Sequence, residues 1–117
     1  MEAIFIEYAI IEDRFESILK HSNKFNADKH NSLNQKLRKV KDMQREKKSL
    51  VGKYISEELI EEISLWKEER NRLIHALMKQ NLHTEDLETI AIVGQQLAKT
   101  ISNKTKSYNN ALASKQK

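Results

Sequence analysis

Residues 59–78 read LIEEISLWKEERNRLIHALM, and this stretch decides the fold. Apolar residues recur in it at intervals of three and four, the spacing of an α-helix with one buried face. On a helical wheel of about 100° per residue, six of them fall within roughly 60° of Arg70. These six are Leu59, Ile63, Trp66, Leu73, Ile74 and Leu77. The sequence therefore predicts a helix of a packed bundle with an arginine in the middle of its apolar stripe.

The rest of the chain predicts further helices around this one. A first helix is expected over residues 3–22, and a second after Asn31 or Ser32, either of which can cap it. Gly52 marks a break before the third helix, which is expected over residues 56–80. A fourth starts at Thr84 and continues toward residue 108, and the polar residues 103–117 are expected to fray. The short connection between the third and fourth helices makes them antiparallel neighbours.

The composition excludes several other classes of protein. The 117 residues include two Gly, no Pro and no Cys, which rules out a disulfide framework, a thiolate metal site and a Gly-rich phosphate loop. So few turn residues disfavour a β-sandwich or barrel. We therefore predict one all-α domain over residues 1–117, an up-and-down four-helix bundle. A core this small gains stability from oligomerisation.

Nothing in the sequence directs the chain to a membrane. No apolar run approaches the length of about 18 residues that a membrane span needs. The first residues, MEAIFIE, start acidic and lack the basic start and uninterrupted apolar core of a signal peptide. A cytoplasmic protein is expected. The net charge of +4 permits an anionic partner but is a weak nucleic-acid signal by itself.

Arg70 is the most informative residue of the stripe. A guanidinium cannot escape burial by losing its proton, and desolvating it without a partner costs several kcal/mol or more. Arg70 therefore needs a carboxylate, carbonyl groups, an open cleft or an anionic ligand. One reading is purely structural, with Arg70 paired to an acid such as Glu12 or Asp13, or reaching the surface along its aliphatic stem.

Asn71 and His75 suggest a second interpretation, in which Arg70 belongs to a catalytic site. They are four residues apart, share one face of the helix, and lie roughly 100–140° from Arg70 on the shoulder of the stripe. A histidine both takes and gives a proton near neutral pH, and an arginine beside it can stabilise a pentavalent phosphorane. RNA carries its own nucleophile, the 2′-hydroxyl, so this chemistry requires neither a metal nor a cysteine.

The stretch from Trp66 to His75 resembles the motif of the HEPN superfamily, the "higher eukaryotes and prokaryotes nucleotide-binding" domain. That motif is an arginine, a polar residue that is often asparagine, three more residues and a histidine, on the third main helix of a small bundle. Arg70, Asn71 and His75 match it. The specific match covers about ten residues, and the rest of the chain agrees in length and helical character only.

The resemblance implies a bundle of HEPN type that forms a homodimer, with the two motif helices facing each other across a shared cleft. It also implies a metal-independent endoribonuclease, often the toxin of a toxin–antitoxin or phage-defence system with a nucleotidyltransferase-type antitoxin as partner. Carried over, His75 is the acid/base group, Arg70 binds the scissile phosphate and Asn71 orients the site. Products would carry a 2′,3′-cyclic phosphate or its hydrolysis product.

A nuclease also needs a basic surface along which RNA approaches. Candidates for it are Arg72, on the opposite face of the motif helix, and the basic second helix with Lys36, Lys39 and Arg45. A solvated charged face is the other interpretation of that helix. No metal or cofactor is predicted, since no two histidines are spaced as helical ligands.

Two non-enzymatic interpretations remain beside the nuclease. In one, a HEPN-like module uses Arg70 and His75 to hold a nucleotide or a partner protein without catalysis. In the other, the chain is a structural bundle with a buried pair between arginine and glutamate.

Overall fold

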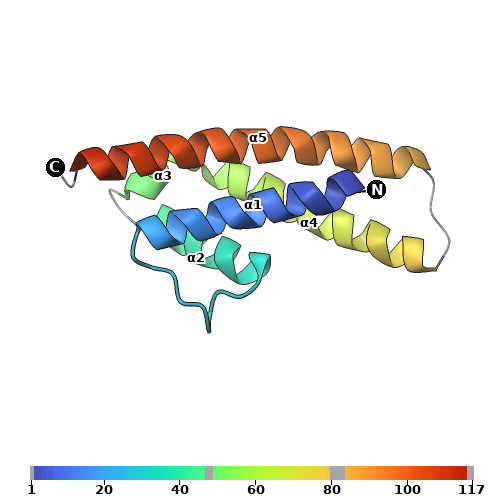
Figure 1. Ribbon diagram of the computed structural model, residues 1–117, viewed down its shortest axis with the longest axis horizontal. Helices are drawn as coiled ribbons and strands as arrows, with labels where there is room; N and C mark the ends of the chain where they lie inside the picture. The colour runs from blue at the N-terminus through green and yellow to red at the C-terminus, as the bar shows by residue number, and fades with distance from the viewer. Residues whose placement is uncertain (1, 47–48, 80–83, 116–117) are drawn as a thin grey trace.

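The computed structural model describes residues 2–46, 49–79 and 84–115, and most of these are helical. The helices are α1 (Glu2–His21), α2 (Leu33–Arg45), α3 (Leu50–Tyr54), α4 (Glu57–Met78) and α5 (Thr84–Lys115) (Figure 1). These ranges contain no strand, so the predicted all-α class is confirmed. None of their helices combines the length and apolar composition that crossing a membrane requires.

Two serines start the helices where the sequence predicts. The Ser32 hydroxyl accepts a hydrogen bond from the Gln35 amide at 3.3 Å and caps α2. The Ser56 hydroxyl accepts from the Leu59 amide at 3.1 Å, just before α4. Acidic residues in the first turn of α4 oppose the positive end of its dipole. Local side-chain chemistry thus fixes both starts.

Helices α1 and α5 lie side by side and run in the same direction (Figure 1). Arg14 Nε on α1 donates to Ser102 Oγ on α5 at 3.1 Å. Further along both helices, Asn109 Nδ2 donates to Ser17 Oγ at 3.2 Å. The two helices are therefore parallel.

Helix α4 runs antiparallel to α1, α2 and α5 (Figure 1). Lys67 Nζ donates to Asn34 Oδ1 at 2.9 Å, whereas Arg45 at the far end of α2 lies 3.8 Å from the Glu57 carboxylate. The predicted antiparallel arrangement of α4 and α5 is confirmed. However, α1, α2 and α5 share one direction, which differs from the predicted up-and-down alternation. Residues 22–32 form a connection long enough to return alongside α1 before α2 begins.

The last helix is longer than predicted. Residues 103–115, expected to fray, continue α5, while residues 116 and 117 lie outside the described ranges. The reason is Tyr108, whose ring is buried and whose hydroxyl hydrogen-bonds the Ser22 hydroxyl. This contact with the end of α1 anchors the helix far into the polar segment.

A further departure from the prediction concerns Gly52. It lies inside the short helix α3, which Ser49 caps by accepting from the Gly52 amide at 3.4 Å. The break expected at this glycine therefore falls on either side of α3.

One apolar core joins all five helices, and α5 packs closely against α1 and α4 at Gly94. The core includes Phe15, Ile63 and Ile101, all fully buried. A Cβ added at Gly94 would lie 2.5 Å from Glu7 Oε1 and 2.5 Å from the Trp66 ring. Only a glycine therefore lets α5 pack this closely against α1 and α4.

Candidate functional site

Arg70 lies inside the bundle, where α4 crosses the start of α1. It is 8% exposed. Its Nε donates to the main-chain carbonyl of Ile4 at 3.2 Å, and its Nη1 donates to Asn71 Oδ1 at 3.0 Å. The predicted burial of this arginine is therefore observed, and a carbonyl and an amide hold its guanidinium.

Two aromatic rings of α1 face the same guanidinium. Its central carbon lies 4.0 Å from the centre of the Tyr8 ring and 5.0 Å from that of Phe5. Both distances fall within cation–π range. Tyr8 in turn contacts Trp66, with 6.4 Å between the ring centres. The site is thus a cation in an aromatic setting at one end of the bundle.

Burial lowers the pKa of Arg70, because desolvation disfavours the charged form. Burial raises the pKa of Tyr8, and the nearby negative charge of Glu12 raises it further. The phenol therefore stays neutral beside the guanidinium and offers its ring face as the attractive partner.

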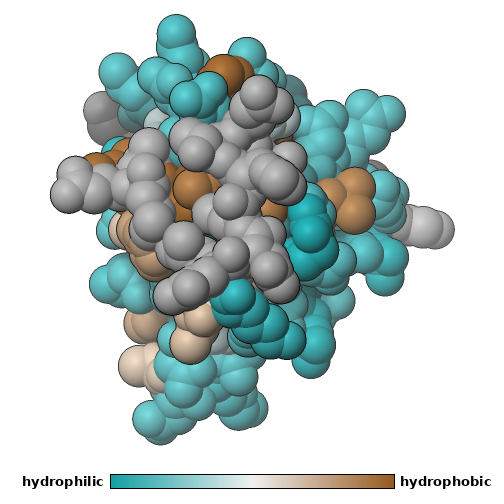
Figure 2. Space-filling model, turned by 90° about the vertical axis from the view of Figure 1, so that its right-hand side faces the viewer, coloured by the Kyte–Doolittle hydropathy of each residue, from teal (hydrophilic) through white to brown (hydrophobic). Residues whose placement is uncertain are grey.

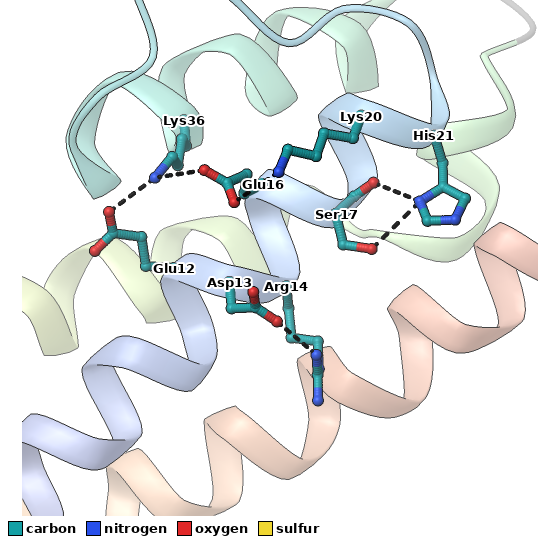
Figure 3. Close-up of polar contacts among 8 residues, drawn as sticks. All are labelled: Glu12, Asp13, Arg14, Glu16, Ser17, Lys20, His21 and Lys36. Carbon is teal, nitrogen blue, oxygen red and sulfur yellow. Dashed lines mark hydrogen bonds and ion pairs between the residues drawn. The ribbon is translucent and has the colours of Figure 1, made fainter. Parts of the chain in front are cut away.

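The acids suggested for a structural ion pair have other partners. Glu12 Oε1 binds Lys36 Nζ at 2.8 Å, and Asp13 Oδ2 binds Arg14 Nη1 at 2.7 Å (Figure 3). Among the residues that the structure describes, no carboxylate lies within ion-pair distance of Arg70. The structural interpretation, in which Arg70 pairs with a buried glutamate, is therefore wrong: its hydrogen-bond partners are the Ile4 carbonyl and Asn71.

Asn71 and His75 lie on the exposed shoulder of α4, as predicted. Asn71 joins the surface to the interior because its side chain accepts the hydrogen bond from Arg70. His75 follows one turn later on the same face, with its side chain exposed. The three motif residues therefore form a continuous edge from the buried cation to an accessible imidazole. The side chain of Leu77, placed in the same stripe by sequence, is not among those described.

The proposed RNA-binding residues lie in three different environments. Lys36 is buried beneath α1, with Glu12 at 2.8 Å and Glu16 at 3.6 Å (Figure 3). Its placement on an exposed basic face was wrong, because the helical phase that buries Leu33 and Leu37 also turns Lys36 inward.

Lys39 and Arg45 lie on the outer side of α2. Lys39 is partly exposed, and the side chain of Arg45 is 60% exposed. Arg45 lies 3.8 Å from the Glu57 carboxylate. Glu57 precedes His75 by about five turns of α4, which is roughly 27 Å. Arg72 is exposed near the motif, and its Nε donates to Glu69 Oε2 at 3.1 Å. That hydrogen bond lowers the pKa of Glu69. The fold therefore brings Arg72 close to the motif but leaves Arg45 far from it.

Several apolar side chains are exposed on α1, α4 and α5. At the end of the molecule seen in Figure 2, apolar residues show as separate brown areas between polar ones. Phe5, which contacts Arg70, is 48% exposed, and Met78, one turn beyond His75, is 77% exposed. Ile6, Ile92 and Val93 are exposed on the neighbouring parts of α1 and α5. Exposed apolar side chains of this size offer contact area for other molecules.

Sequence reasoning missed Phe5, Tyr8 and the Ile4 carbonyl. The spacing of the two aromatic residues, three apart on α1, gave a usable signal that they share a face. A main-chain carbonyl carries no such signal. No group of three or more His, Asp or Glu side chains within the described ranges is placed to hold a metal ion.

The chain was compared with family models, with curated proteins and with solved structures, and none of these matches it.

Proposed function

We propose that the protein is a metal-independent endoribonuclease of HEPN type. In this proposal it acts as the toxin of a toxin–antitoxin or phage-defence system. The observation that carries the proposal is the buried Arg70 guanidinium, which has a carbonyl, an amide and two rings around it and no carboxylate among the described residues. Its positive charge is therefore not neutralised, and it is linked through Asn71 to the edge that bears His75.

The reaction needs a base, an acid and a cation at one phosphate. His75 takes the proton of the 2′-hydroxyl, whose oxygen attacks the adjacent phosphorus. The bond from phosphorus to the 5′-oxygen breaks, and that oxygen leaves with a proton from an imidazolium. Arg70 stabilises the additional negative charge on the phosphorane, and Asn71 fixes the orientation of Arg70. The products are a 2′,3′-cyclic phosphate and a 5′-hydroxyl.

We propose that a second copy of the chain completes this site. His75 lies on an exposed shoulder, and a shallow edge becomes a deeper cleft when two copies face each other. Exposed Phe5 and Met78 beside the motif supply apolar contact area for such a pair. A nucleotidyltransferase-type antitoxin is the proposed protein partner. Arg72, Lys39 and Arg45 are proposed as contacts to RNA phosphates beyond the cleavage point.

One observation favours a different function, a HEPN-like module that binds a nucleotide or a partner protein without catalysis. The guanidinium is nearly enclosed, and two of its nitrogens already donate to Ile4 and Asn71. In this alternative, Arg70 shapes the surface and His75 contacts the ligand without transferring a proton.

The test is RNA cleavage by the purified protein in excess EDTA. The wild type is expected to cut a mixed RNA substrate, and His75→Ala is expected to lower the rate by about 10²–10⁴-fold. His30→Ala, on the connection before α2, is the matched control and should cut like the wild type. If the wild type and His75→Ala both leave the RNA intact, the enzyme proposal fails and the binding module is favoured.

A further inference from the structure

A groove of about 450 Å³ lies between α1 and α5, which run side by side (Figure 1). Ile6 and Ile10 on α1 and Ala98 on α5 provide its apolar walls. Ile6 is 57% exposed, so this wall reaches solvent. On a helical wheel, Ile6 and Tyr8 are about 160° apart on α1. Because Tyr8 faces Arg70, the groove opens on a different side of α1 from the motif.

Glu7 lines the same groove, although only 7% of it is exposed. Its Oε1 is enclosed next to Gly94 and has no hydrogen-bond partner among the described residues. Its Oε2 is not enclosed in this way and is therefore the oxygen that a molecule in the groove can reach. Burying an ionised carboxylate without a positive partner is costly. A cation that enters the groove would offset that cost, so Glu7 marks the place for a positive group.

Lys99 adds the opposite charge to the groove lining. It follows Gly94, the neighbour of Glu7, by five residues, which is about 7.5 Å of helix rise. Lys99 is exposed, and none of the ion pairs within the described ranges involves it. Both charges of the groove are therefore available to another molecule. A molecule that pairs with both carries a positive and a negative group about one helical turn apart.

An α-helix meets these requirements. Its residues four apart lie on one face with a separation of about 6 Å along the axis. Two neighbouring helices leave a groove in which a third helix packs, and apolar side chains serve as its anchors. We propose that this groove binds an amphipathic helix of a partner protein. Its apolar residues pack on Ile6, Ile10 and Ala98, a basic side chain pairs with Glu7, and an acidic side chain pairs with Lys99.

A second copy of the chain fits this groove less well than a separate helix does. In a two-fold contact the same surface meets itself, so one groove would face another groove and leave a void between them. A convex helix fills the groove instead. Binding of such a helix does not require the proposed nuclease activity.

The test is calorimetric titration of the full chain with a synthetic helical peptide of about 18 residues, long enough to be helical in water. The peptide has an Ala and Gln background, leucines at intervals of three and four, and a Lys and a Glu four residues apart beside the leucines. It is expected to bind. The same peptide with Gln in place of both charged residues is expected to bind about tenfold more weakly, because both charge pairs are lost.

Glu7→Gln separates a ligand contact from a structural role. It is expected to weaken binding of the charged peptide about tenfold without lowering the melting temperature, since it removes an unpaired buried charge. Ile6→Gln should also weaken binding. Ile92→Gln is the matched control, because Ile92 is 58% exposed, lies outside the groove lining and should leave binding unchanged.

Three results of the titrations would overturn the proposal. They are no binding of the charged peptide at millimolar concentration, equal binding of the two peptides, and wild-type binding by both Glu7→Gln and Ile6→Gln. Sedimentation of the protein alone gives a further check. Ile6→Gln is expected to leave the oligomeric state unchanged, whereas a dimer that this substitution dissociates would show that a second copy covers the groove.

Discussion

The guanidinium carbon of Arg70 lies 4.0 Å from the centre of the Tyr8 ring, so a charge on α4 rests directly on an aromatic side chain of α1. The same guanidinium donates to the carbonyl of Ile4, one turn earlier on α1. Arg70 therefore fastens two helices together and also carries the positive charge of the candidate site. Replacing Arg70 should therefore affect both stability and activity.

Arg70→Met is expected to lower the free energy of unfolding by about 1–3 kcal/mol, because a hydrogen bond and the contact with the rings are lost. Urea denaturation measures this difference. Arg72→Met is the matched control on the same helix; its exposed contact with Glu69 should be worth less than about 1 kcal/mol. Equal unfolding of the two variants would show that Arg70 does not join the helices.

Substitution of Lys36 is expected to affect stability, whereas substitution of Lys39 or Arg45 is expected to affect RNA binding. Lys36→Met should cost about 1–2 kcal/mol of stability, since it leaves the partly buried Glu12 without its cation and Glu16 with Lys20 alone, yet RNA affinity should not change. Lys39→Gln and Arg45→Gln should each weaken RNA binding severalfold at low salt and leave the fold intact. Filter binding at two salt concentrations, together with thermal melting, tests this. A loss of RNA affinity confined to Lys36→Met would contradict the assignment.

Gly94→Ala should destabilise the protein, although alanine is ordinarily the better helix former by about 1 kcal/mol. The new methyl group would lie 2.5 Å from both the Glu7 carboxylate and the Trp66 ring. We expect a loss of about 1–3 kcal/mol, the usual cost of overpacking. Gly52→Ala, where the nearest atom is 3.1 Å away, should cost less. A Gly94→Ala variant as stable as the wild type would show that α5 does not pack this closely.

The titration of Glu7 should contribute a loss of stability as the pH rises above about 4.5. Burial raises the pKa of this carboxyl from 4.5, and its Oε1 has no hydrogen-bond partner among the described residues. Between the unfolded and folded pKa values the native state binds more protons than the unfolded state, so the free energy of unfolding falls through that window.

Glu7→Gln should remove this contribution. The variant is expected to be more stable than the wild type at pH 7, with the difference closing toward pH 4. Unfolding measured across this pH range checks the sign. A variant that is less stable at pH 7 than the wild type would mean that the native state favours the ionised carboxylate.

Much of the site was predictable because it depends on one helix. The phase of α4 buries Arg70 and exposes Asn71 and His75, and local capping at Ser56 fixes where that helix starts. The partner of Arg70 was not predictable, since the acceptor is a main-chain carbonyl of another helix, Ile4. Every residue has such a carbonyl, so no residue type marks this one.

The arrangement of the other helices depends on contacts between distant residues. The length of α5 follows from the burial of Tyr108 against Ser22, whereas the polar composition around Tyr108 suggests fraying. The direction of α2 follows from the path of residues 22–32. In the same way, Lys36 looked like part of a basic face until its two glutamate partners on α1 were known.

The most direct test of the central claim is to replace the nucleophile in the substrate. A short RNA that the wild type cleaves is compared with the same sequence carrying a 2′-O-methyl group at the nucleotide before the cut, in excess EDTA. The account predicts a 2′,3′-cyclic phosphate or its hydrolysis product at the end of the first RNA, and no cut at the methylated position. Cleavage there at an unchanged rate would contradict attack by the 2′-hydroxyl, and with it the roles of Arg70 and His75.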